Sequence, residues 1–195
     1  MNLKKLTCQV IIFCIGLFIL AIGIAFAINS DLGISPVNSL PFAAHLVSGI
    51  NMGTAVTVFL LLLIGLQAVI LRREFKLIEL TQIVFSTLFG FFVDLAIFIV
   101  GDFTIPMYAG QLAMLAISIV LVATGIAMYL EAKLISLPPE GIIIAIIKKY
   151  PRHTFTRVKV MFDCILVYGP CNYAGVFAWY IRNKGRHNNF CNTLG

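Results

Sequence analysis

The chain has 195 residues, of which 61% are hydrophobic and 11% are charged, and its formal net charge is +6. A soluble domain carries about 25% charged residues, and a water-soluble core of this length could not cover so much apolar surface. The composition therefore excludes an ordinary soluble domain and indicates a protein embedded in a lipid bilayer.

Four long apolar runs follow one another along the chain, and a fifth begins near Val158 but becomes irregular. A helix of about 20 residues crosses about 30 Å of hydrocarbon, so each of the four can span a membrane. The first run is longer than the apolar part of a signal peptide, and we interpret it as a retained helix. We expect an all-α membrane protein with five transmembrane helices, or six in an intact form. The four runs are Cys8–Ile28, Thr54–Leu71, Leu80–Val100 and Ala109–Leu130.

Basic residues occupy alternate connections between these runs. They precede the first run, follow the second and lie between the fourth and fifth, whereas residues 29–53 and 101–108 contain neither Lys nor Arg. By the positive-inside rule, the N-terminus and the second and fourth connections are cytoplasmic. The distribution predicts a multi-pass protein of the cell (cytoplasmic) membrane with the bilayer as its partner, and it argues against a nucleic-acid partner.

The connection after the first run predicts a short helix from Pro36 to Val47. Ser35 suits the N-cap and Pro36 the first helical position, and Ser48–Gly49 ends the apolar pattern. About 12 residues are too few to cross the hydrocarbon, so we expect a half-helix.

The fourth connection repeats this design. Pro139 and Glu140 mark the start of a second short helix, where a carboxylate suits the positive end of the helix dipole. The apolar residues Ile142–Ile147 follow, and Lys148–Lys149 ends the helix. By the charge rule, the first short helix lies outside and the second lies inside.

Each short helix follows the first helix of a set of three, so the two sets have opposite orientations. That arrangement predicts a 3+3 inverted repeat. We expect one helical membrane domain over residues 1–167, with repeat one at about 8–100 and repeat two at about 109–167, and then an irregular tail, 168–195. The alternative is that both segments are ordinary interfacial loops with proline turns.

Three carboxylates lie within or beside the apolar runs. Asp94 lies inside the third run, where a carboxylate costs about 2.5–3.5 kcal/mol on insertion scales. We predict that Asp94, Asp163 and Glu140 line a polar path between the two halves. The alternative is local pairing, such as Asp163 with Lys159 four residues earlier. The candidate substrate- or ion-binding residues are Ser35, Pro36, Asn38, Asp94, Pro139, Glu140 and Asp163.

Catalytic and metal chemistry have little support in the sequence. The five cysteines form no C-x-x-C pair and the three histidines are isolated, so we expect no metal site and no cofactor. No nucleophile–base arrangement, phosphate-binding loop or dinucleotide fingerprint is present, and we predict that the protein is not an enzyme.

Five stretches carry a resemblance to a known family: Leu32–Leu40, Gln67–Arg73, Phe89–Leu95, Leu137–Gly141 and Phe155–Val167. Over about residues 8–167 the chain resembles the YczE/YyaS/YitT-type bacterial integral membrane proteins. The resemblance implies a repeat-built, multi-pass protein of the cytoplasmic membrane. It supplies no catalytic residues.

The tail departs from this pattern after about Val167. Pro170, Asn172 and Gly175 stand where the fifth helix should continue, and later basic residues fall on the predicted outer side. A reading frame shifted by one base permits codons that continue an apolar helix. We therefore hypothesise a frameshifted or mis-sequenced gene, which the nucleotide sequence tests directly.

Two functions fit these observations. The first is a small secondary-transporter-like protein of unknown substrate, with the N-termini of the two short helices facing a small polar solute or ion. The second is a non-transporting scaffold or regulatory membrane protein, and a defective frameshifted product is a further alternative. Convergence of the polar residues on one cavity would favour transport.

Overall fold

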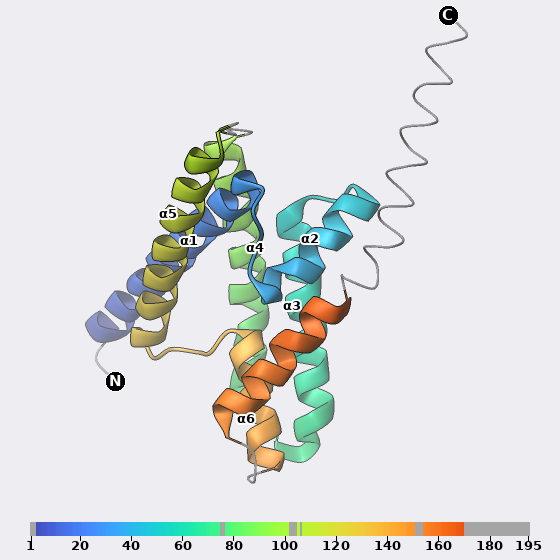
Figure 1. Cartoon of the computed structure of the whole chain (residues 1–195). Helices are drawn as coiled ribbons and strands as arrows, with labels where there is room; N and C mark the ends of the chain where they lie inside the picture. The colour runs from blue at the N-terminus through green and yellow to red at the C-terminus, as the bar shows by residue number, and fades with distance from the viewer. Residues whose placement is uncertain (1–2, 75–76, 102–104, 106, 151–153, 170–195) are drawn as a thin grey trace, which may run out of the picture.

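The computed structural model describes residues 3–74, 77–101, 105, 107–150 and 154–169. Within these ranges the chain has seven α-helices and no strand (Figure 1). Most of the predicted tail, residues 170–195, lies outside them, and the predictions made for it stay predictions. The elements are α1 (Leu3–Ser30), α2 (Pro36–Ser48), α3 (Met52–Leu71), the short 3₁₀ turns η1 (Arg72–Glu74) and η2 (Leu77–Leu80), α4 (Thr81–Val100), α5 (Tyr108–Glu131), α6 (Pro138–Lys149) and a helix over residues 155–169.

The four predicted apolar runs are confirmed as α1, α3, α4 and α5. In the described part of the chain, these four helices are long and apolar enough to cross a membrane. The 155–169 helix begins close to the predicted fifth run, and its membrane crossing remains a prediction. The chain is thus a helical protein with membrane-spanning segments.

The two short helices α2 and α6 begin in the same way. Ser35, before α2, has φ −63° and ψ 150°, and Leu137, before α6, has φ −64° and ψ 156°. Each helix then opens with proline, whose missing N–H is harmless in a first turn. In Figure 1 both helices start near the middle of the molecule, and α2 runs to the upper end while α6 runs to the lower end.

Helices α1 and α5 pack antiparallel through small residues. A Cβ atom added to Gly125 would lie 2.8 Å from the carbonyl oxygen of Gly16. Further along, the Ser118 hydroxyl donates a hydrogen bond to the Gly23 carbonyl at 2.7 Å. Because backbone meets backbone here, the two helices approach more closely than larger side chains would allow.

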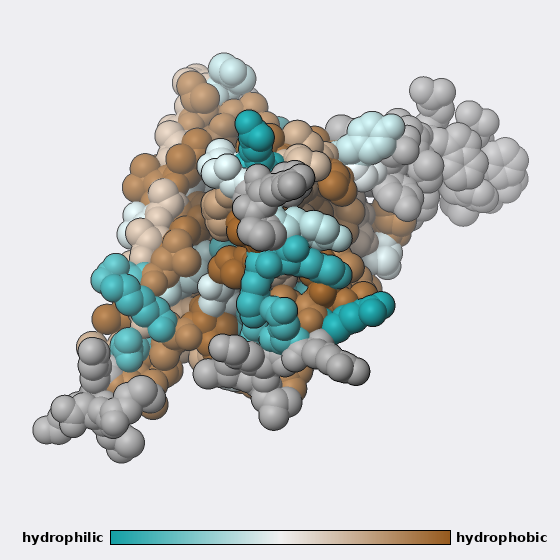
Figure 2. Space-filling model, turned by 90° about the horizontal axis from the view of Figure 1, so that it is seen from below, coloured by the Kyte–Doolittle hydropathy of each residue, from teal (hydrophilic) through white to brown (hydrophobic). Residues whose placement is uncertain are grey.

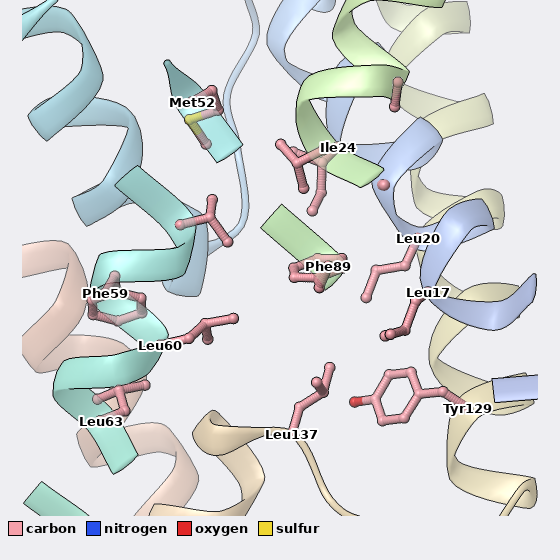
Figure 3. Close-up of a cluster of buried hydrophobic side chains, with 14 of the residues drawn as sticks. Leu17, Leu20, Ile24, Met52, Phe59, Leu60, Leu63, Phe89, Tyr129 and Leu137 are labelled. Carbon is pink, nitrogen blue, oxygen red and sulfur yellow. The ribbon is translucent and has the colours of Figure 1, made fainter. Parts of the chain in front are cut away.

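Helix α4 also packs against α1, and apolar side chains fill the centre. The ring centroids of Phe13 and Phe85 lie 4.7 Å apart, and those of Phe18 and Phe92 lie 5.6 Å apart. Figure 3 shows the buried side chains that α1, α3, α4 and α5 direct toward the middle. The packing encloses the region where the two short helices begin.

Basic residues gather at the lower end of the molecule. Lys148 Nζ lies 3.1 Å from a carboxylate oxygen of Glu74, and Lys149 donates to the Ile70 carbonyl at 3.3 Å. Figure 2 shows hydrophilic surface over the middle of this end. The fold therefore brings two of the basic connections to the same side, although the orientation of that side in the cell stays a prediction.

Candidate functional site

A central cavity of about 180 Å³ lies between the starts of the two short helices. All seven described helices contribute to its wall, so the whole described fold takes part in shaping it. Six of the seven candidate residues line it, and Asp94 does not. The polar lining residues are Ser35, Asn38, Tyr129, Glu140, Lys159 and Asp163, and the others are Leu20, Ile24, Pro36, Val37, Val56, Phe59, Leu60, Phe89, Val122, Ile126, Leu137 and Pro139.

Glu140 is the acidic group at the start of α6. The Tyr129 hydroxyl donates a hydrogen bond to Glu140 Oε1 at 2.9 Å, while Glu140 Oε2 is buried without a partner among the described residues. In Figure 3 the Tyr129 hydroxyl points toward Leu137, just before α6. Burial raises the pKa of the Glu140 carboxyl, and the Tyr129 hydrogen bond opposes the shift only in part.

Asp163 enters the cavity from the 155–169 helix. Its Oδ2 lies 3.5 Å from Lys159 Nζ, one helical turn earlier, as the alternative interpretation of the sequence predicted. This pair occupies one oxygen only, because Asp163 Oδ1 is buried with no partner in the described ranges. Local pairing and a place in the cavity are therefore compatible.

The α2 side of the cavity is polar but uncharged. Asn38 Nδ2 donates to Ser35 Oγ at 3.2 Å, an exposed hydrogen bond that links the two side chains. The Ser39 hydroxyl donates to the Pro36 carbonyl at 2.6 Å and also lies 3.2 Å from the Leu166 carbonyl, so α2 contacts the 155–169 helix here. This wall presents hydroxyl and amide groups together with the N-terminal end of α2.

Asp94 lies in a different place. Its Oδ1 accepts a hydrogen bond from the Gly53 N–H at 2.6 Å, at the N-terminal end of α3. An N-terminal N–H has no partner within its own helix, so a carboxylate from α4 satisfies it. Asp94 lines a separate hollow with Asn29, His45 and Asn51. The structure does not place it on a path with Glu140 and Asp163.

Sequence reasoning did not select Tyr129 or assign Lys159 a place in the cavity. Tyr129 stands at the end of an apolar run, so its sequence context indicates a core residue. In the structure it is 1% exposed. The sequence could indicate Tyr129 only when it is considered together with Glu140. The tyrosine lies near the end of one spanning helix, and the glutamate lies at the start of the next helix.

A model of the family described as "Family of unknown function (DUF6198)" matches residues 7–178. "Uncharacterized protein YyaS" of Bacillus subtilis (strain 168) is 28% identical over 156 residues, which are 79% of this chain and 73% of that protein. "Uncharacterized membrane protein YczE" of the same organism is 27% identical over 135 residues, 69% of this chain and 60% of that protein. No solved structure matches.

These comparisons confirm the YczE and YyaS parts of the predicted resemblance. The likeness to YitT remains a prediction. The family match ends at residue 178, within the region predicted to be the tail.

Proposed function

Because the chain belongs to the DUF6198 family, whose description names no activity, we propose a function from the central cavity itself. The protein is a small secondary-transporter-like protein of the cytoplasmic membrane, with its N-terminus inside. A small polar solute or ion binds in the central cavity between α2 and α6.

The observation that carries this proposal is the convergence of polar groups. Two carboxylates, a lysine, a tyrosine hydroxyl and the starts of two short helices share one cavity in a chain that is otherwise apolar. Ionisable residues at membrane depth are costly and are typical of substrate and ion pathways. A scaffold whose helices only pack has no need of this cluster.

The backbone supports an inverted repeat. Asp31 and Lys133 follow α1 and α5 with φ values of 55° and 51°, and both are among the few non-glycine residues with positive φ in the described ranges. Asp31 and Lys133 stand the same number of residues apart as Pro36 and Pro138, which open α2 and α6. The same shift in residue number therefore relates Asp31 to Lys133 and Pro36 to Pro138.

The tertiary contacts repeat under the same displacement. It relates Gly16 to Ser118 and Gly23 to Gly125, and the structure brings Gly16 to Gly125 and Gly23 to Ser118. Because α1 and α5 are antiparallel, the two halves are inverted relative to one another. Inverted repeats with a site at their interface are a recurring design of secondary transporters.

A flux assay tests the function. Purified protein is reconstituted in liposomes and exposed to a panel of amines, amino acids, sugars and inorganic ions, with and without a pH gradient. We expect at least one solute to give uptake or charge displacement, and Glu140→Gln to lose it. The matched control is Glu131→Gln, which changes an exposed carboxylate paired with Lys133. If no solute moves, the scaffold alternative is favoured.

A further inference from the structure

A second polar pocket lies on the other side of the first turn of α6. Its volume is about 380 Å³, which is within the range of small-ligand sites. Leu137, Pro139 and Glu140 face the central cavity, whereas Gly141 lines this inner pocket, which extends to Lys148 near the lower end. The pocket is lined by Gln67, Leu71, Glu79, Gln82, Leu134, Ile135, Ser136, Gly141, Ile144, Ala145 and Lys148.

Two buried glutamine amides, Gln67 and Gln82, line the inner pocket. Gln67 is 3% exposed and Gln82 is 4% exposed, and the Oε1 atom of each has no partner among the described residues. Gln67 Nε2 lies 3.4 Å from Glu79 Oε2, toward which it donates. Both amides approach Gly141, where an added Cβ would lie 2.9 Å from Gln67 Oε1 and 3.2 Å from Gln82 Nε2. The absence of a side chain at Gly141 therefore leaves room for the amides.

Among the described residues, the buried side-chain atoms that lack a partner are all oxygens. In the described part of the chain they are five side-chain oxygens. Four of the five line the two cavities, and the fifth is the Ser86 hydroxyl oxygen. An unpaired buried acceptor is destabilising, so the two cavities together favour a ligand that brings hydrogen-bond donors. The four oxygens are Gln67 Oε1, Gln82 Oε1, Glu140 Oε2 and Asp163 Oδ1.

The charges in the central cavity indicate which kind of hydrogen-bond donor a ligand should bring. The Lys159 ammonium group lies beside Asp163 Oδ2 and leaves Oδ1 open. Glu140 adds a second carboxylate, which forms no ion pair among the described residues, although the Lys159 charge also acts on it. When both acids are ionised, one lysine faces two carboxylates, so the cavity carries a net negative charge and favours a cation.

We propose that the cargo is a small organic cation with N–H donors, of the protonated primary amine class, and that Gln67 and Gln82 bind it in the inner pocket. This inference rests on the proposed function and names the substrate class. The amine binds Glu140 and Asp163 in the central cavity and the two glutamine carbonyls in the inner pocket. The first turn of α6 separates the two stations, so the amine passes this turn when it moves between them.

A binding assay that needs no transport tests this inference. Methylammonium chloride is added to purified protein in detergent, and the unfolding temperature is measured against tetramethylammonium chloride at equal ionic strength. Both ions carry one positive charge, but only methylammonium has N–H donors. We expect methylammonium alone to raise the unfolding temperature, and the Gln67→Met/Gln82→Met variant to bind it about tenfold more weakly. Gln111→Met is the matched control, because Gln111 lines neither pocket.

A second measurement covers the case in which the double variant fails to fold. Ser136→Cys is placed in the inner pocket of a chain whose five native cysteines are replaced by alanine. We expect methylammonium to slow the reaction of this cysteine with N-ethylmaleimide, and tetramethylammonium to leave the rate unchanged.

The outcomes separate the two proposals. Equal effects of the two ammonium ions, or stabilisation by acetate or glycerol instead, would overturn the amine class while leaving transport to be judged by the flux assay. Methylammonium binding that depends on the glutamines, without flux of any solute, would support the site and overturn the transporter function.

Discussion

Helices α2 and α6 share a backbone design but differ in chemistry. Both begin with proline after an extended residue, and both N-termini meet the central cavity. At corresponding positions, α2 carries Asn38, which bonds to Ser35, whereas α6 carries Glu140, one of whose oxygens has no partner among the described residues. The comparison teaches that the two helix starts share a backbone geometry, whereas in the lining of the cavity only the α6 start carries a charged side chain. Both helix starts line the cavity, and under the proposed function they bind its occupant unequally.

The largest effect is expected from a substitution that disrupts the contact between α1 and α5. Gly125→Leu places a bulky side chain against the α1 backbone at Gly16, so we expect a loss of about 1–3 kcal/mol or more in stability. The unfolding temperature and the size-exclusion profile in detergent measure it. Gly65→Leu is the control, because Gly65 has no neighbouring atom within 4 Å of an added Cβ. Equal behaviour of the two variants would contradict a tight α1–α5 contact.

The next effect concerns the charge on α6. Glu140→Gln removes a buried carboxylate, and methylammonium binding should weaken by about tenfold or more, since a nearby charge pair contributes several kcal/mol at an effective dielectric constant of about 20. Asn38→Asp in the same protein returns a carboxylate from the α2 side. We expect titration calorimetry to show partial recovery. No recovery would mean that the two helix starts are not interchangeable.

A smaller effect is expected from the hydroxyl that holds Glu140. Tyr129→Phe keeps the ring and removes one hydrogen bond to Glu140 Oε1. Methylammonium affinity should fall by about 1 kcal/mol, or roughly fivefold, because the carboxylate is less well oriented. Unchanged affinity, with Glu140→Gln still defective, would show that Tyr129 only packs.

The stability should also depend on pH through Glu140. Its pKa is raised by burial in the folded protein, so the stabilising contribution of this group is present at acid pH and is lost as the pH rises through the folded-state pKa. Tyr129, Lys159 and Asp163 face the same cavity and set the background. As the pH rises above the ordinary pKa of a glutamate carboxyl, the unfolding temperature should decline less in Glu140→Gln than in the unaltered protein.

The smallest effect is expected at the lower end of the molecule. Lys148→Met breaks the contact with Glu74, but both side chains are largely exposed. Exposed ion pairs contribute less than about 1 kcal/mol, so the unfolding temperature should change little. A large loss would indicate that this end couples the two halves more strongly than its exposure suggests.

The sequence anticipated the elements better than their contacts. Apolar runs predicted four helices, and Ser35–Pro36 correctly predicted the start of α2, because these signals are local. The partner of Asp94 was not predictable, since the Gly53 N–H lies on another helix and leaves no trace in composition. Tyr129 was missed for the same reason, as a tyrosine in an apolar helix indicates packing until its partner is known.

The glycine contact between α1 and α5 has a consequence for motion. With Gly16 and Gly125 backbone to backbone, sliding one helix along the other would drive carbonyls into larger side chains. Rotation about this line keeps the glycines together. If the protein transports as proposed, this contact is the line about which its two halves rotate, opening the cavity first to one face of the bilayer and then to the other.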